Sequence, residues 1–169
     1  INLYEEEQIS FLKKLSFQDE IKNWPIEKTE NHEFYLNNGA FCEGDSEYWY
    51  QIIRYLKPKR IIEIGSGFST LIAIKALAKN KEEGFESELT CIEPYEMAWL
   101  ERMNVNLIRE KVENIDICFF KKLNKNDILF IDSSHIIRPE GDILYEYLNI
   151  LPSLNKGVFV HIHDICTPY

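Results

Sequence analysis

Apolar residues along the chain fall into two kinds of pattern. Short apolar runs, typical of buried strands, occupy residues 60–64, 89–92, 105–112, 127–131 and 158–162, of which 105–112 is the most polar. Helical spacing marks the segments 3–15, 45–56, 69–79, 94–103 and 143–151. Because strands that alternate with helices are typical of an α/β fold, the pattern predicts a doubly wound, mostly parallel sheet.

Polar residues and prolines predict where several helices begin and end. Asp45 and Asp142 are candidate N-caps, because a short carboxylate can accept a hydrogen bond from the first turn of a helix. Pro94 can begin a helix, since the first turn needs no backbone donor there. Pro58 and Pro152 are expected to end the helices that precede them.

The sequence up to residue 44 has a less regular apolar pattern than the rest of the chain. A helix over residues 3–15 is followed by irregular sequence, with turn signals at Trp24-Pro25 and at residues 37–39. We expect residues 1–44 to form a helical and loop-rich cover on an α/β domain of residues 45–169, the two together making one globular unit.

Acidic residues outnumber basic ones by 28 to 19, which gives the 169-residue chain a net charge of -9. This charge repels polyanions, so we expect no nucleic-acid partner. No stretch approaches the roughly 20 apolar residues needed to cross a bilayer, so we expect no membrane partner.

The cysteines lie far apart and form no CxxC pair, which disfavours a zinc ribbon or a redox dithiol. They are Cys42, Cys91, Cys118 and Cys166. Reduced cysteines are typical of the cytoplasm, which is the localisation we predict.

Two glycines follow the strand at 60–64, in the sequence IEIGSGFST. Small molecules bind beyond the carboxyl ends of parallel strands, and Gly65 and Gly67 let the backbone come close to such a ligand. A dinucleotide-binding turn would have a third glycine where this chain has Thr70. Glu63 would repel a phosphate but can accept a hydrogen bond from an ammonium group. The turn therefore favours a ligand that carries an amino group.

The strand at 89–92 ends at Glu93, and an acid in this place can accept hydrogen bonds from ribose hydroxyls. The alternative is that Glu63 and Glu93 are exposed carboxylates at strand ends and that the glycines serve only a tight turn. Their occurrence at successive strand ends favours a nucleoside site.

The motif ExGxGxST, with an acid after the next strand, resembles the class I S-adenosylmethionine-dependent methyltransferases, which have a Rossmann-like fold. The resemblance implies that the glycine turn contacts the methionine part of S-adenosylmethionine, that Glu93 holds its ribose, and that Tyr95 lies near its adenine. The predicted S-adenosylmethionine-binding residues are Glu63, Gly65, Ser66, Gly67, Ser69, Thr70, Glu93, Pro94, Tyr95 and Asp132.

Two further motifs, FIDSSH at 130–135 and HIHD at 161–164, follow strands that end at the same sheet edge. One interpretation is a divalent metal site formed by Asp132, His163 and Asp164, which would lower the pKa of an acceptor hydroxyl. The other is a general base, for which His135 beside Asp132 is the candidate catalytic pair. We expect His161 to point away from the site.

These motifs also resemble metal-dependent small-molecule O-methyltransferases of the catechol type. His163-Asp164 stands where that family has Asp-Asn, which leaves magnesium, a softer metal or no metal open. The DSSH and HDI text is also similar to bacterial methyltransferase-like proteins linked to sugar, macrolide and cephalosporin modification, some of which are named hydroxylases. We expect O-methylation of a small-molecule or sugar hydroxyl. The alternatives are a hydroxylase-like metal enzyme and a non-catalytic nucleoside-binding or assembly module.

Methyltransferases of this class usually continue with two more strands after the fifth, whereas this sequence stops at Tyr169. We expect either that the chain is a fragment that lacks these strands or that a second copy completes the sheet edge as a homo-oligomer. Aromatic residues that can line an acceptor pocket, or else pack in the core, are Trp24, Tyr35, Phe41, Tyr48 and Trp49.

Overall fold

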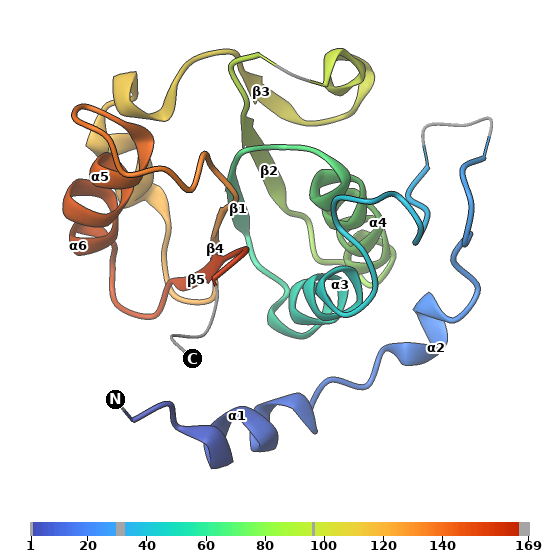
Figure 1. Cartoon of the computed structure of the whole chain (residues 1–169). Helices are drawn as coiled ribbons and strands as arrows, with labels where there is room; N and C mark the ends of the chain where they lie inside the picture. The colour runs from blue at the N-terminus through green and yellow to red at the C-terminus, as the bar shows by residue number, and fades with distance from the viewer. Residues whose placement is uncertain (1, 30–32, 96, 166–169) are drawn as a thin grey trace.

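Five parallel strands form one sheet in the computed structural model, which describes residues 2–29, 33–95 and 97–165. Along the sheet the order is β3-β2-β1-β4-β5 (Figure 1). The strands are β1 (Arg60–Ile64), β2 (Glu88–Ile92), β3 (Asn106–Ile108), β4 (Ile128–Ile131) and β5 (Phe159–Ile162). The predicted α/β fold with a parallel sheet is confirmed, and β3 is shorter than the predicted run at 105–112.

The register aligns the carboxyl ends of the three central strands. Ile64 pairs with Ile92 of β2 on one side and with Ile131 of β4 on the other. The residues that follow these strands therefore emerge at one edge of the sheet, where ligands of open α/β sheets bind.

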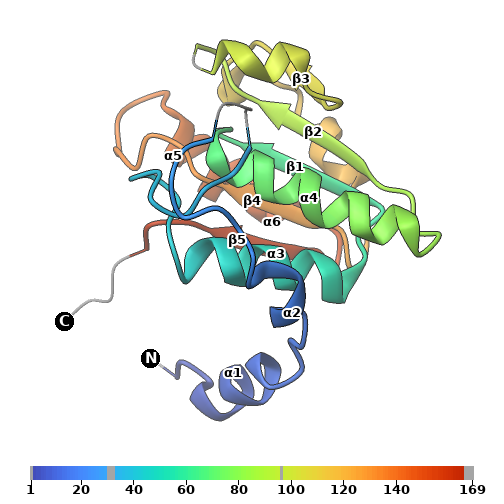
Figure 2. The ribbon, with the colours of Figure 1, turned by 90° about the vertical axis from the view of Figure 1, so that its right-hand side faces the viewer.

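Helices cover both faces of the sheet (Figures 1 and 2). One face carries α3 (Asp45–Leu56) and α4 (Phe68–Glu82), and the other carries α5 (Asp142–Tyr145), the π-helical η4 (Glu146–Ile150) and α6 (Leu151–Ser153). Shorter elements are α1 (Glu5–Leu12), α2 (Gln18–Ile21) and the 3₁₀ segments η1 (Ala98–Arg102), η2 (Val112–Asn114) and η3 (Ile117–Lys122). None of the helices in the described part of the chain combines the length and hydropathy of a membrane span.

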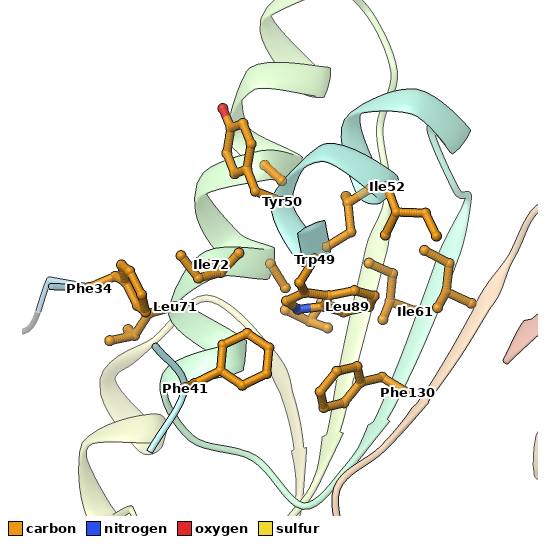
Figure 3. Close-up of a cluster of buried hydrophobic side chains, with 14 of the residues drawn as sticks. Phe34, Phe41, Trp49, Tyr50, Ile52, Ile61, Leu71, Ile72, Leu89 and Phe130 are labelled. Atoms are coloured by element: carbon orange, nitrogen blue, oxygen red, sulfur yellow. The ribbon is translucent and has the colours of Figure 1, made fainter. Parts of the chain in front are cut away.

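Alternation along the strands divides the core into two layers. Ile61 and Phe130 face α3 and α4, where the rings of Trp49 and Phe130 lie 4.6 Å apart (Figure 3). Ile62 and Ile131 face the opposite way and pack with Val112, Phe120, Leu123 and Ile150. Because both faces are buried, the strands are continuous apolar runs.

Two of the predicted helix boundaries are wrong. Pro94 does not begin a helix, because Met97 adopts a left-handed conformation with φ 54° that separates it from η1. Pro152 does not end the helix before it, because the helix type changes at Ile150 and Pro152 falls in the first turn of α6, where no backbone donor is needed.

The predicted N-caps Asp45 and Asp142 are also wrong. Gly44 and Gly141 occupy the cap positions, and each aspartate is the first residue of its helix. Both aspartates contact residues at the sheet edge instead, as described below. The cysteines at 42, 91 and 118 are free thiols, whereas His32 and Cys166 lie outside the described residues.

Candidate functional site

Gly65 makes the closest backbone approach at the sheet edge. Its N–H donates to the Ile92 carbonyl at 3.0 Å, and its φ of +76° is a left-handed conformation. A Cβ at this position would lie 1.8 Å from the carbonyl oxygen of Asp132. Only glycine fits, so the turn after β1 brings bare backbone against the end of β4.

Glu63 stabilises this turn through hydrogen bonds. Its carboxylate is fully buried and accepts hydrogen bonds from Ser69 Oγ at 2.5 Å and Thr70 Oγ1 at 2.8 Å. Burial raises the pKa of Glu63 to about 7, although these hydrogen bonds oppose the shift. Thr70 Oγ1 also accepts from the Gly67 N–H at 3.1 Å. The carboxylate predicted to contact an ammonium group is thus engaged with the start of α4.

Glu93 joins the end of β2 to the same turn. One carboxylate oxygen accepts from the Ser66 N–H at 3.3 Å, and the other accepts from the Tyr95 N–H at 3.0 Å. The ring of Tyr95 is 74% exposed beside it. Arg109 braces the loop by donating to the carbonyls of Glu93 and Met97. Sequence reasoning missed Arg109, for which the available signal was a cation directly after β3.

Two cavities meet the glycine turn. One, of about 380 Å³, lies between the ends of β1, β2 and β4. Its lining includes Gly65, Glu93, Pro94, Tyr95, Asp132 and Ser133. The other, of about 200 Å³, borders residues 65–69 and is closed by Ala40 and Phe41 from the N-terminal segment. A larger cavity of about 670 Å³ extends from Tyr95 toward α5, away from the residues after β4 and β5.

The carboxyl ends of β4 and β5 bring two imidazoles to one carboxylate. Asp132 Oδ1 lies 3.3 Å from His135 Nε2 and 3.2 Å from His163 Nδ1. Asp164 Oδ1 lies 3.5 Å from the same nitrogen of His163. The structure therefore brings together all four residues that the two motifs supplied.

A metal-ligand geometry involves a different histidine from the predicted one. Single ligand atoms of Asp132, His135 and Asp164 all lie within 4.8 Å of one another, which is close enough to share one ion. His163 is only 6% exposed, and both of its ring nitrogens face carboxylates. Burial alone would lower the pKa of His163, but the nearby Asp132 carboxylate and hydrogen bonds to Asp132 and Asp45 raise it.

Two residues of this cluster have unfavourable backbone conformations. His135 and Asp164 have φ values of 55° and 54°, in the left-handed region that non-glycine residues seldom occupy. Such conformations cost about 1–3 kcal/mol each and occur preferentially at functional sites. Here they turn both side chains toward Asp132.

The segment that carries His135 is anchored by the two serines that precede it. Asp142 accepts from the Ser134 N–H at 2.9 Å and from Ser134 Oγ at 2.8 Å. Burial raises the pKa of Asp142, but the hydrogen bonds from Ser134 outweigh it and the pKa is lowered. Ser133 Oγ donates to Glu146 at 3.0 Å, and burial raises the pKa of Glu146 to about 7.

His161 does not join the carboxylate cluster, although it lies on the same sheet face as His163. The two histidines are two positions apart, so the alternation of side chains along a strand places them on the same face and does not turn His161 away. Its ring packs 4.8 Å from Phe130 and 5.3 Å from Trp49. Burial, and the neighbouring His163, lower the pKa of His161 to about 4.

Most of the aromatic residues predicted to line an acceptor pocket or pack in the core belong to the core. Trp49 is fully buried, and its Nε1 donates to the Ser69 carbonyl at 3.2 Å. Phe41 is also buried in the core, where it closes the smaller cavity and packs 4.9 Å from the His163 ring.

Comparisons with known proteins find a family model and a relative that match this chain. Residues 62–165 match the sequence model of a family described as a methyltransferase domain. A protein of Archaeoglobus fulgidus without a characterised function is 34% identical over 135 residues, which cover 76% of this chain and 60% of that protein. The chain thus spans less than two thirds of that relative.

A crystal structure from Plasmodium falciparum is also similar. It is of a protein assigned as a protein-L-isoaspartate O-methyltransferase, in complex with S-adenosyl-L-homocysteine. The identity is 12% and the TM-score 0.45, with 85% of this chain and 67% of that chain covered.

Proposed function

Because the chain belongs to the methyltransferase domain family, we propose that it transfers a methyl group from S-adenosylmethionine to a hydroxyl of a small molecule or sugar. One observation carries the proposal. Gly65, the acid Glu93 and Asp132, which His135 contacts, line the same 380 Å³ cavity at one sheet edge.

The donor-binding roles follow from the partners of each residue. The backbone at Gly65 and Gly67 can come close to a ligand, because neither residue has a side chain. Glu93 is the proposed ribose ligand, because its carboxylate follows β2 on the wall of the 380 Å³ cavity and can accept hydrogen bonds from hydroxyl groups. The exposed Tyr95 ring can cover an adenine. Glu63 contributes to donor binding indirectly, by stabilising the glycine turn.

The acceptor needs a group that removes its hydroxyl proton. His135 is the proposed base, because Asp132 lies 3.3 Å from its Nε2 and can orient and stabilise the ring as it gains a proton. When bound, the donor supplies an electrophilic methyl group, and the hydroxyl oxygen must face it in line.

A divalent ion is the second way to acidify the hydroxyl. Asp132 and Asp164 supply the hard oxygen ligands that magnesium prefers, and His135 adds an imidazole nitrogen, which suits softer ions. We propose Asp132, His135 and Asp164 as the ligands. Since one imidazole nitrogen cannot be both base and ligand, chelation distinguishes the two roles of His135.

Donor binding tests the proposal directly. Calorimetric titration with S-adenosylhomocysteine should show an affinity at least tenfold weaker for Glu93→Gln, because ribose hydroxyls lose a charged acceptor. The matched control is Glu88→Gln at the opposite end of β2, where the carboxylate contacts Asn106 and Arg60. Equal affinities for the wild type and Glu93→Gln would contradict the proposed pocket.

The product formed from a hydroxylated acceptor distinguishes the alternative functions. Transfer of a labelled methyl group to small hydroxylated acceptors supports O-methylation. Donor binding without transfer would indicate a nucleoside-binding module, and incorporation of oxygen into the acceptor would indicate a hydroxylase-like enzyme. Transfer that survives a chelator but not His135→Ala would support the base over the ion.

A further inference from the structure

Asp45 makes a contact that no motif suggests. It is the first residue of α3, yet its Oδ2 lies 3.4 Å from Nε2 of His163, which is 118 residues away in the sequence. The other ring nitrogen of His163 lies 3.2 Å from Asp132. A continuous chain of polar contacts therefore joins the start of α3 to the end of β4.

The His163 ring between these carboxylates has little freedom to turn. It is 6% exposed, and its centroid lies 4.9 Å from the Phe41 ring and 6.5 Å from the Phe130 ring, which stacks on it at 24°. Carboxylates flank the ring on both sides, since Nε2 faces Asp45 and Nδ1 faces Asp132 and, at 3.5 Å, Asp164. Both ring nitrogens are therefore engaged, and the ring is held beside Asp132.

We propose that Asp45 is a positioning residue for methyl transfer, acting through His163. Its carboxylate fixes Nε2, so Nδ1 faces Asp132 Oδ1, the same oxygen that His135 approaches. This inference rests on the proposed function. The proposal gives α3 a role in the function of the site, whereas its other contacts with the sheet belong to the core.

The location of Asp45 makes the proposal testable without unfolding the protein. Its side chain is 60% exposed although its partner is buried, so its removal opens no cavity. Glu47 lies in the same first turn of α3 and makes no hydrogen bond with the cluster among the described residues. Glu47→Ala is a matched control, since it removes an equal charge from the same helix end.

Kinetics of Asp45→Ala, Asp45→Glu and Glu47→Ala provide the first measurement. We expect kcat to fall 10- to 100-fold in Asp45→Ala, as for other groups that orient reacting residues, with donor Kd and Tm within error of Glu47→Ala. Asp45→Glu should recover part of the loss. Equal kcat values for Asp45→Ala and Glu47→Ala would overturn the proposal.

Nitrogen-15 chemical shifts of the His163 ring provide the second measurement, which needs no turnover. Loss of Asp45 should shift the Nε2 signal, whereas loss of Glu47 should leave both ring signals in place. A wild-type protein that transfers no methyl group would refute the proposed function alone. Ring signals unchanged in Asp45→Ala would refute the positioning role, whatever the activity.

Discussion

Gly65 offers the sharpest test at the level of a single residue. In Gly65→Ala the new Cβ would lie 1.8 Å from the Asp132 carbonyl oxygen, and alanine disfavours the φ of +76°. The turn must move away from β4. We expect the free energy of unfolding to fall by about 1–3 kcal/mol and the affinity for S-adenosylhomocysteine to fall more than tenfold. Urea denaturation and calorimetry measure the two effects.

Gly67→Ala is the control for this prediction. A Cβ at Gly67 would meet only Met97 Cε, at 3.7 Å, which is an ordinary contact, and its φ of -171° is extended backbone. We expect little change in the free energy of unfolding. If Gly65→Ala were as stable as Gly67→Ala, the close approach of the two strand ends would be wrong.

Residues that follow strands could be located from the sequence because parallel strands share one carboxyl edge. The rule placed Gly65, Glu93 and Asp132 together. It could not show that Glu63 turns its carboxylate onto Ser69 and Thr70, because such partners depend on the packing of α4. Contacts between distant segments, such as Asp45 with His163, have no signal in a single sequence.

At the level of the elements, Arg54 joins three helices. Its guanidinium is buried in α3 and donates to Glu20 of α2 at 2.8 and 2.9 Å, and to Glu83 and Asn80 at the end of α4. Hydrogen bonding from Arg54 lowers the pKa of Glu20. In Arg54→Leu these polar groups lose their buried partner. We expect the free energy of unfolding to fall by about 3 kcal/mol.

Lys79→Gln, which removes an exposed ion pair with Glu82 on α4, is the control. Surface pairs of this kind contribute little, so its Tm should match the wild type. Proteolysis should also cleave Arg54→Leu faster within residues 22–29, which lose the α2 anchor. A wild-type Tm for Arg54→Leu would show that the three helices do not depend on this cation.

Strands and long helices were predictable because burial imposes a clear apolar period. β1, β2, β4 and β5 lie within one residue of their predicted bounds. The 3₁₀ segments between β3 and β4 escaped prediction, since they are short and are held by tertiary packing of residues such as Phe120. The change to π geometry at Glu146 likewise has no signature in the apolar spacing.

Across the whole molecule, two buried acids couple stability to pH. Burial raises the pKa of both Glu63 and Glu146 to about 7, compared with 4.5 for an exposed glutamate. From about pH 4.5 to about pH 7 the folded state therefore binds more protons at these groups than the unfolded chain does. Their contribution to stability must fall as the pH rises through this window.

His161 opposes this trend, because its pKa is lowered to about 4 from 6.5 and its contribution to stability rises with pH between these values. Comparing a variant with the wild type removes the opposing term. Glu146→Gln should gain stability relative to the wild type as the pH rises from about 5 to about 7, by about 1–3 kcal/mol, and the gain should then level off.

Urea denaturation at several pH values measures the gain, with Glu7→Gln in the exposed part of α1 as the control for a change of charge. A difference between Glu146→Gln and the wild type that stays constant with pH would mean that Glu146 ionises normally in the folded protein. Glu146 accepts a hydrogen bond from Ser133, so an ionised Glu146 would place a negative charge next to the segment that carries Asp132 and His135. The same titration therefore tests whether the acid that contacts this segment, Glu146, is uncharged at neutral pH.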